Sequence, residues 1–377
     1  MEKENMYCGV DLHYGKSTFC FIDGKGNIKD PLEIKTDKKD IEDLLRKCQG
    51  SRISYAFEAG GMARYFYKIV HEMENTEKIH VVHPYKFKII TESKNKNDKE
   101  DSRKLAKALL KDYLPYPVHI KSEKSRQLQL LLGLRKRRVV ARTKITNQAK
   151  GIVRGLGIKA SVKSLKSDRG FNNTINALAE YKFEQDILRE LHAEFRTETE
   201  KITGSEKKIQ ELIDREFRKD YALLETIPGI GFVTAATILS VVDNIDRFDT
   251  AGKFSSYCGL VPSEHSSGTK IIHGRITKEG STNLRTLLIQ AAWSIVRGRK
   301  QEEDQRLKRL RKKFYRISVK QKNAQRAVTA VARHLSRIIF GVLKHQEEYS
   351  GIIRKPEECR FIRLGFDKLS ENKTQAC

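Results

Sequence analysis

Short apolar runs separated by polar and turn residues dominate the first part of the chain. Alternation over such runs is typical of strands that bury one face, and turn residues such as those at 24–27 mark tight connections. We expect strands at 6–12, 17–23, 27–36, a segment ending at Glu58, and 80–82. Charged or amphipathic segments between them predict helices at 38–48, 62–74, 84–92 and 99–112.

Three meandering strands followed by alternating helices and strands is the element order of an RNase H-like fold. The prediction for residues 1–120 is therefore an α/β domain, one sheet flanked by helices.

Longer periodicities appear in residues 121–219. One apolar row recurs every seven residues, and a neighbouring row is interrupted by Glu198 and Ser205; the first row is Leu188, Phe195, Ile202 and Ile209. This spacing predicts a helical hairpin or short coiled coil, with an ordinary bundle core as the alternative. The Gly-, Ser- and Asn-bearing stretch 155–180 predicts a linker.

A third, helical domain is predicted over 220–349. Gly229 and Gly231 stand between two helical segments, and such a turn resembles a helix-hairpin-helix element, in which backbone N–H groups approach a phosphate. A simple tight turn is the alternative. Further along we expect a polar loop, a helix capped near Ser281, a basic segment at 299–326, an amphipathic helix at 327–344 and a poorly packed tail at 350–377.

Charge points to the partner. The 377 residues include 74 Lys and Arg against 48 Asp and Glu, a net charge of +26. A charge of this size predicts a polyanionic partner and salt-sensitive binding. The runs at 135–138 and 306–322 are candidate nucleic-acid contacts, and a solvated helix face is the alternative for each.

The six cysteines show no metal-binding spacing and are expected to be reduced thiols. We find no signal-peptide pattern and no apolar run of about 20 residues, so the expectation is a cytoplasmic protein that does not enter a membrane.

Four acidic residues stand out in a chain whose net charge is positive. Asp11 and Glu58 each close an apolar run, and Asp98 and Asp101 share one face at the start of a helical segment. Carboxylates are hard oxygen ligands suited to Mg²⁺ or Mn²⁺ bound at a phosphodiester. The set predicts a metal-dependent phosphoryl-transfer site, whereas His13 and His83 are expected to be structural or surface groups.

These residues stand in motifs that resemble a known family. Cys8-Gly9-Val10-Asp11, Phe57-Glu58-Ala59-Gly60 and the stretch 96–103 are similar to the three acidic motifs of the DEDD transposases, insertion-sequence recombinases with a RuvC-like domain that are related to Piv-type invertases. The likeness continues through 227–231, 259–262, 266–268 and 276–280, and it covers residues 6–345. Asn97 departs from the family, which often has Thr there, but at an expected helix cap.

The resemblance implies a serine nucleophile in the C-terminal domain. Ser267 is the matching position, Ser266 is its rival, and Ser263 ranks third. Positive charge near the phosphate is expected from Arg275, Lys278 and Arg285. The nucleic-acid contacts that we expect are Arg135, Arg137, Arg138, Gly229, Gly231, Arg275 and Lys278.

The resemblance also implies double-stranded DNA partners, namely element ends and target, together with a structured guide RNA. A tetramer built from two dimers, with the serine of one subunit facing the carboxylates of another, and a place at the prokaryotic nucleoid are implied as well.

Other functions fit parts of the sequence. A metal-dependent endonuclease of the junction-resolvase kind would use water in place of Ser267. An actin-like sugar kinase would explain Gly9-Val10-Asp11 followed by Lys16-Ser17-Thr18, but a second Gly-rich phosphate loop is missing. A purely architectural nucleic-acid binder would not need the carboxylates.

Overall fold

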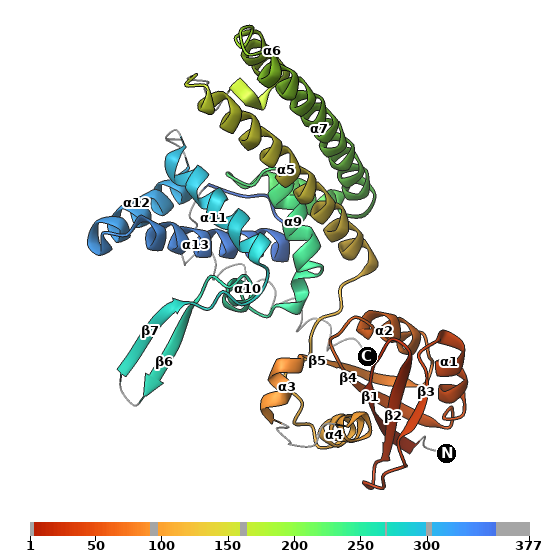
Figure 1. Cartoon of the computed structure of the whole chain (residues 1–377). Helices are drawn as coiled ribbons and strands as arrows, with labels where there is room; N and C mark the ends of the chain where they lie inside the picture. The colour runs from red at the N-terminus through yellow and green to blue at the C-terminus, as the bar shows by residue number, and fades with distance from the viewer. Residues whose placement is uncertain (1–3, 91–96, 159–163, 268–269, 299–303, 352–377) are drawn as a thin grey trace. The chain divides into compact units, whose positions relative to one another are not determined.

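The computed structural model describes residues 4–90, 97–158, 164–267, 270–298 and 304–351 (Figure 1). The chain divides into two compact units, Met1–Lys121 and Ser122–Cys377. We call them the smaller and the larger unit. The further division at 219 stays a prediction, and nearly all of the expected tail lies outside the described residues. Among the described helices, none is both long and apolar enough to cross a membrane.

The smaller unit contains a five-stranded mixed sheet in the order β3-β2-β1-β4-β5. Its strands are β1 (Glu4–Asp11), β2 (Lys16–Asp23), β3 (Leu32–Lys35), β4 (Ser51–Glu58) and β5 (Thr76–Val82). The first three strands pair antiparallel, and β1, β4 and β5 pair parallel. This is the element order expected of an RNase H-like domain.

Two strand predictions were wrong in length. The third strand is shorter than 27–36: Pro31 stands directly before β3, and upstream of it only Ile28 makes an isolated bridge, to Ile22. The fifth strand is longer than 80–82, because the polar residues at its start pair with β4 although their side chains alternate poorly.

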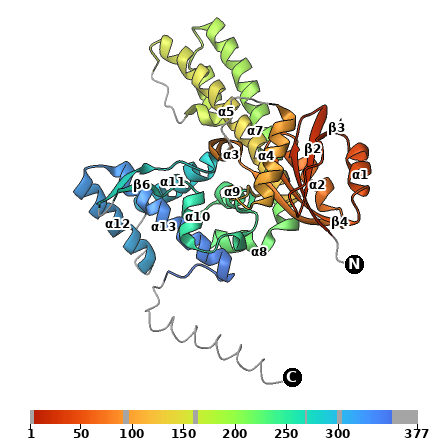
Figure 2. The ribbon, with the colours of Figure 1, turned by 90° about the horizontal axis from the view of Figure 1, so that it is seen from below.

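Helices cover both faces of this sheet (Figures 1 and 2). On one face lie α1 (Lys38–Arg46) and α2 (Ala63–His71), where the Phe66 ring packs edge-on against Phe19, Tyr55 and Phe57. The other face is covered by α3 (Pro84–Ile90) and α4 (Asp98–Leu110), which bury Ala56, Val82 and Leu105. The sheet is therefore the middle layer of three.

In the larger unit, α5 (Glu123–Gly155) and α7 (Lys182–Glu216) form an antiparallel arm. Successive contacts Arg135–Glu206, Arg138–Ser205 and Arg142–Thr199 establish the opposite directions. The apolar row of α7 that recurs every seven residues, from Leu188 to Ile209, is buried throughout. Ser205, which interrupts the neighbouring row, accepts a hydrogen bond from Arg138.

Two hydrophobic clusters hold the arm, one at each end. At its base, Leu128 and Ile209 join the main core of the unit. At its tip, α6 (Asp168–Asn176) packs on α7, and Phe171 lies flat on His192 with ring centroids 5.0 Å apart. The prediction of a linker at 155–180 was therefore wrong, because Phe171, Ile175 and Leu178 complete a small core.

The main core of the larger unit is helical. The remaining elements of the larger unit are α8 (Arg218–Glu225), α9 (Phe232–Val242), α10 (Ala251–Tyr257), β6 (Pro262–Ser267), β7 (Lys270–Ile276), α11 (Thr282–Arg297), α12 (Gln305–Gln321) and α13 (Ala324–His345). Short 3-10 turns lie at Ser164–Lys166 and Ile245–Arg247. Ser281 caps α11 by accepting from the Leu284 N–H at 3.3 Å, as predicted. The expected polar loop is instead the β6–β7 hairpin, and the basic segment at 299–326 contains α12.

Candidate functional site

Close packing of α4 on the sheet sets the geometry of the candidate site. A Cβ added to Gly9 of β1 would lie 2.1 Å from the carbonyl oxygen of Ser102 and 2.4 Å from the backbone nitrogen of Ala106. Only a residue without a side chain permits this approach. Gly9 therefore points toward α4, and so does Asp11, because side chains two residues apart on a strand share one face.

Glu58 lies beside Asp11 at the same edge of the sheet. The parallel register of β1 and β4 pairs Gly9 with Ala56 and Val10 with Phe57, so the next residues along the two strands are Asp11 and Glu58. Ala56 belongs to the cluster packed under α4, and Glu58 follows it on the same face. The side chain of Glu58 is exposed, and it has an interaction partner of its own.

The first turn of α4 brings further carboxylates. Asn97 caps the helix by accepting from the Lys99 N–H at 3.2 Å, which agrees with the predicted cap. One ligand atom each from Asp11, His13 and Asp98 lies within 4.8 Å of the other two. The Nε2 atom of His13 is 3.2 Å from Oδ2 of Asp11. Strand end, turn and helix start thus meet at one point.

The charges of the cluster act on one another. Burial raises the pKa of the Asp11 carboxyl, and the negative charges of Asp98 and Asp101 raise it further, whereas the nearby His13 ring opposes the rise. Asp101 is paired with Lys104 at 3.3 Å. An anionic cluster of this kind favours a cation, which would lower the repulsion among the carboxylates.

The donor set fits a divalent metal ion. Asp11 and Asp98 offer carboxylate oxygens and His13 offers an imidazole nitrogen, at separations that a single ion can span. The Asp11 side chain is 23% exposed, so an ion has access to it. The sequence prediction had set His13 aside. The available signal was its position two residues after Asp11. Because β1 ends at Asp11, strand alternation does not predict the direction of the His13 side chain, and the turn conformation brings its ring to Asp11.

In the larger unit, the predicted nucleophile lies on the β6–β7 hairpin. The backbone of Ser267 pairs with Lys270, and that of Ser266 pairs with Ile271. The side chains of 265–273 lie outside the described part of the structure. Ser263, the third-ranked serine, packs over Gly274, where an added Cβ would lie 2.3 Å from its Oγ atom.

Arg285 was predicted to sit near a phosphate, but it is buried and engaged with the protein backbone. Only 8% of it is exposed, and its guanidinium donates to the carbonyl of Lys278 at 2.9 Å and to the Thr282 hydroxyl at 3.3 Å. Its role here is to fix the loop before α11. Arg275 and Lys278 are exposed, as a contact to nucleic acid requires.

The other predicted nucleic-acid contacts divide into two groups. Arg135 and Arg138 hold α5 to α7, through Glu206 and through Ser205, whereas Arg137 is exposed. Gly229 adopts φ +86° in the turn between α8 and α9 and packs against the carbonyl of Ala291. Gly231 is the N-cap residue of α9 and, as a glycine, makes no side-chain capping hydrogen bond there.

Two family models match this chain, one in each half. Residues 8–158 match a family model described as a transposase of the DEDD, IS110 type, and residues 221–308 match one described as "Transposase IS116/IS110/IS902 family". The first model spans the acidic cluster and the second spans the β6–β7 hairpin.

Individual relatives agree with the family models. The transposase for insertion sequence element IS1111A of Coxiella burnetii is 26% identical over 92% of each chain. A probable family 20 transposase of Pseudomonas aeruginosa is 28% identical over 78% of this chain and 85% of its own. The pilin gene-inverting protein of Moraxella lacunata is 29% identical over 40% of this chain and 46% of its own. Two models for the two halves and relatives along nearly the whole length lead to one conclusion: the chain belongs to the IS110-type family of DEDD transposases.

Proposed function

We propose that this transposase is a site-specific DNA recombinase of an insertion sequence, which cuts and rejoins DNA strands with metal assistance and a serine nucleophile. The observation that carries the proposal is the meeting of Asp11 with Asp98, beside Glu58, under the close contact of Gly9 with α4. A protein that only holds DNA gains nothing from anions packed in this way.

Asp11, Glu58, Asp98 and Asp101 would hold the metal, with His13 as a further ligand. Bound Mg²⁺, or Mn²⁺, would supply charge stabilisation at phosphorus and promote removal of the serine proton. The protein's own contribution is to hold the carboxylates together against their mutual repulsion. This repulsion, together with burial, raises the pKa of Asp11.

The proposed chemistry has two displacements. The Ser267 oxygen forms a bond to phosphorus, and the bridging oxygen of the cut strand leaves and takes up a proton as a free hydroxyl. A strand hydroxyl then attacks the phosphoserine, forms a new phosphodiester and returns the serine. The number of phosphodiester bonds is unchanged, so no external energy source is needed.

The partners in this proposal are double-stranded DNA, at the element ends and at the target, and a structured guide RNA that pairs with both. The turn with Gly229 and Gly231 would act as a helix-hairpin-helix-like element whose N–H groups meet a phosphate. Arg137, Arg275 and Lys278 would contact the backbone of the nucleic acid. The active assembly would be a tetramer of two dimers at the nucleoid.

A covalent adduct tests the nucleophile. Purified protein with RNA from the flanking DNA, element-end DNA and Mg²⁺ should give a protein–DNA species that survives denaturation. Ser267→Ala should abolish it, and Ser266→Ala should retain it. An adduct that persists in Ser267→Ala and disappears in Ser266→Ala would exclude our choice of serine.

The second candidate function is a resolvase-like endonuclease that uses water. It is favoured by the fact that the acidic cluster lies entirely in the smaller unit. Cleavage without an adduct, unaffected by Ser267→Ala but lost in Asp98→Asn, would support it over the recombinase.

Mixing two inactive variants tests how the serine and carboxylates are shared. If the serine and the carboxylates of one site come from different subunits, a mixture of the Asp98→Asn and Ser267→Ala proteins regains adduct formation. Such a site combines the intact serine of the first variant with the intact carboxylates of the second. If each chain supplies both, the mixture stays as inactive as its components.

A further inference from the structure

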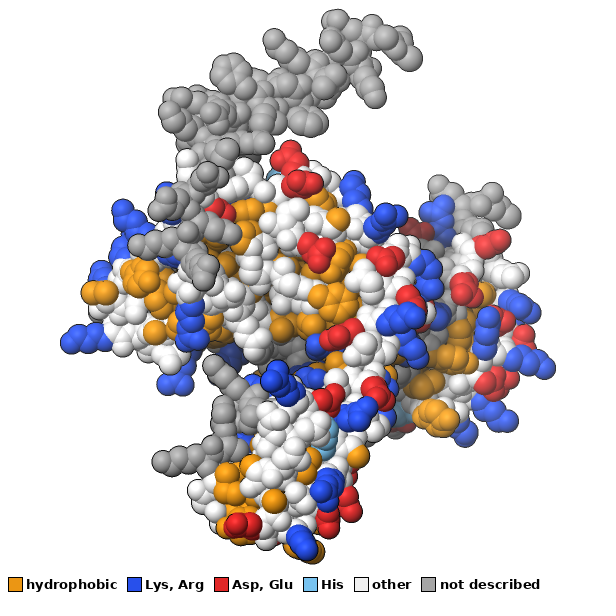
Figure 3. Space-filling view, turned by 90° about the horizontal axis from the view of Figure 1, so that it is seen from above, with side chains coloured by type: hydrophobic (Ala, Val, Ile, Leu, Met, Phe, Trp, Pro, Cys, Tyr) orange, Lys and Arg blue, Asp and Glu red, His pale blue; other side chains and the backbone are white. Residues whose placement is uncertain are grey.

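The hairpin of α12 and α13 concentrates positive charge. A turn at Lys322, with φ 47°, joins the two helices, and their sequences contain no acidic residue. The basic residues of α12 are Arg306, Lys308, Arg309, Arg311, Lys312, Lys313, Arg316 and Lys320. In the space-filling view, Lys and Arg side chains gather at the edge of the larger unit where Figure 1 places α12 (Figure 3).

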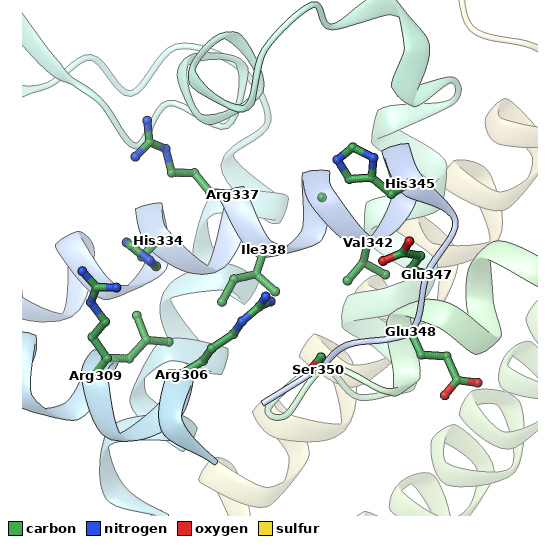
Figure 4. A pocket seen from close by; sticks show the side chains of 12 residues that line it. Arg306, Arg309, His334, Arg337, Ile338, Val342, His345, Glu347, Glu348 and Ser350 are labelled. Atoms are coloured by element: carbon green, nitrogen blue, oxygen red, sulfur yellow. The ribbon is translucent and has the colours of Figure 1, made fainter. Parts of the chain in front are cut away.

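A cavity of about 470 Å³ lies along this hairpin. Arg306 and Arg309 of α12 point toward His334 and Ile338 of α13, whereas Arg337 points away from them (Figure 4). Carboxylates line the cavity only at one end, where Glu347 and Glu348 follow α13. Lys313, Arg316 and Arg333 do not line the cavity but belong to the same two helices, and their charges act on one another or on His334 in its lining. We call the cavity together with these three cations the α12–α13 groove.

Three cations of the groove lack the ion pairs found elsewhere in the chain. Arg135 has Glu206 at 2.6 Å and Lys344 has Asp246 at 2.7 Å. Within the described ranges, Arg309, Lys313 and Arg333 form no ion pair with a carboxylate within 4.0 Å, and the charges of Arg333 and Arg309 act on Lys313 instead.

The pKa values of Lys313 and His334 reflect this repulsion. Burial lowers the pKa of Lys313, and the charges of Arg333 and Arg316 lower it further. Burial also lowers the pKa of His334 to about 4, with a second contribution from Lys313. Partly desolvated cations that face other cations destabilise the fold unless a binding partner compensates them.

We propose that the α12–α13 groove binds the phosphodiester backbone of one nucleic-acid strand. Arg306, Arg309, Lys313 and Arg316 follow one another at intervals of three and four residues, which places them along one side of α12 over about 15 Å. A line of this length exceeds a single phosphate and matches a run of several, since phosphates of one strand rise about 3.4 Å apart along a duplex. Arg and Lys are the residues that commonly bind such phosphates.

This site shares with the proposed function only the premise that the chain handles nucleic acid. It needs neither the acidic cluster nor Ser267. Binding can therefore be measured without a divalent metal, and a failure of the adduct experiment leaves the binding result unaffected.

The test compares two charge-matched variants of the full chain. Arg309→Gln with Lys313→Gln removes two cations from the groove. Lys207→Gln with Lys208→Gln removes two exposed cations from α7. Fluorescent single-stranded RNA, single-stranded DNA and duplex DNA are titrated in EDTA between about 50 and 200 mM salt.

For at least one probe, the groove variant should bind roughly tenfold more weakly, and its log–log salt slope should fall by about 2 relative to the unmodified chain. The probe that loses most identifies the strand type. The α7 variant should keep both values. Equal behaviour of the two variants would overturn the proposal, as would displacement of all probes from the groove by millimolar inorganic phosphate, which would indicate a small-anion site.

Thermal unfolding separates this effect from misfolding. Because the substitutions relieve repulsion, the groove variant should unfold at a higher temperature than the unmodified chain while binding more weakly. A lower midpoint would mean that Arg309 and Lys313 are structural, and it would overturn the inference.

Discussion

Gly9 on β1 lies directly beneath Ser102 on α4, so close that a methyl group on Gly9 would stand 2.1 Å from the Ser102 carbonyl oxygen. This contact fixes the height of α4 above the sheet. It therefore fixes where the first turn of α4, with Asp98, meets Asp11 at the strand end. The separation of the two carboxylates depends on a residue that has no side chain.

Gly9→Ala should accordingly weaken the fold and the site together. Overpacking at a rigid backbone contact typically costs about 1–3 kcal/mol, and relief requires α4 to move away from the sheet. Urea unfolding measures the first effect, and titration with Mn²⁺ measures the second. Gly50→Ala is the control, since nothing lies within 4 Å of its added Cβ; equal losses in both variants would contradict the role assigned to Gly9.

Asp98→Asn should make the metal-free protein more stable, because it removes a charge that raises the pKa of Asp11. The gain should be below about 1 kcal/mol, since Asp98 is exposed. Added Mg²⁺ or Mn²⁺ should raise the melting temperature of the unmodified chain but not that of the variant. Asp40→Asn, in the first turn of α1, is the matched control and should keep the metal effect.

His13→Ala should change metal preference. An imidazole ligand favours transition ions over Mg²⁺, so Mn²⁺ affinity should fall by roughly tenfold and Mg²⁺ affinity by less. Competition titrations of the two ions on the DNA-free protein measure the ratio of Mn²⁺ to Mg²⁺ affinity. Equal losses for both ions would mean that His13 only orients Asp11 through their 3.2 Å contact.

Arg285→Lys should loosen the loop before α11 although the charge is kept. An ammonium group cannot reach the Lys278 carbonyl and the Thr282 hydroxyl in the geometry of the guanidinium. Loss of these partly buried hydrogen bonds should cost about 2 kcal/mol. Chemical denaturation gives the cost, and hydrogen exchange should show faster exchange at 278–280; unchanged exchange there would contradict the assignment.

His334 should make stability fall as pH decreases from about 6.5 to about 4. The unfolded chain takes up the proton near pH 6.5, whereas the folded chain resists it until about pH 4, so protonation favours unfolding within this window. For a partly exposed ring the effect should be on the order of 1 kcal/mol. Urea midpoints at pH 7 and pH 5 should differ more in the unmodified chain than in His334→Gln; an equal difference would contradict this account.

Part of the arrangement around Asp11 follows from local rules. Parallel strand ends share an edge of the sheet, which places Glu58 beside Asp11, and Asn97 is a recognisable helix cap. The place of Asp98 could be expected from the family motif, but local rules do not determine it, since it depends on how α4 packs on Gly9.

Features that depend on tertiary contacts could not be read from the sequence. Polar residues surround Phe171 in the sequence and mask α6, whose packing depends on the contact of Phe171 with His192 of the next helix, α7. The burial of Arg285 depends on backbone carbonyls that a residue pattern does not reveal. The basic run 306–322 was visible as a candidate nucleic-acid contact, but the α12–α13 groove was not, because Lys313 and the Arg333 charge that acts on it are on different helices.

The α5–α7 arm is packed with hydrophobic residues at its base and its tip, while its middle includes the polar contacts of Arg135, Arg138 and Arg142. Hydrogen-bonded side chains adjust to small rotations more readily than interlocked cores. From Arg138 to the end of α5 the helix runs about 25 Å, so a turn of about 10° in the middle shifts the tip by about 4 Å. A small rearrangement of the polar contacts in the middle of the arm would therefore become a large displacement at its tip.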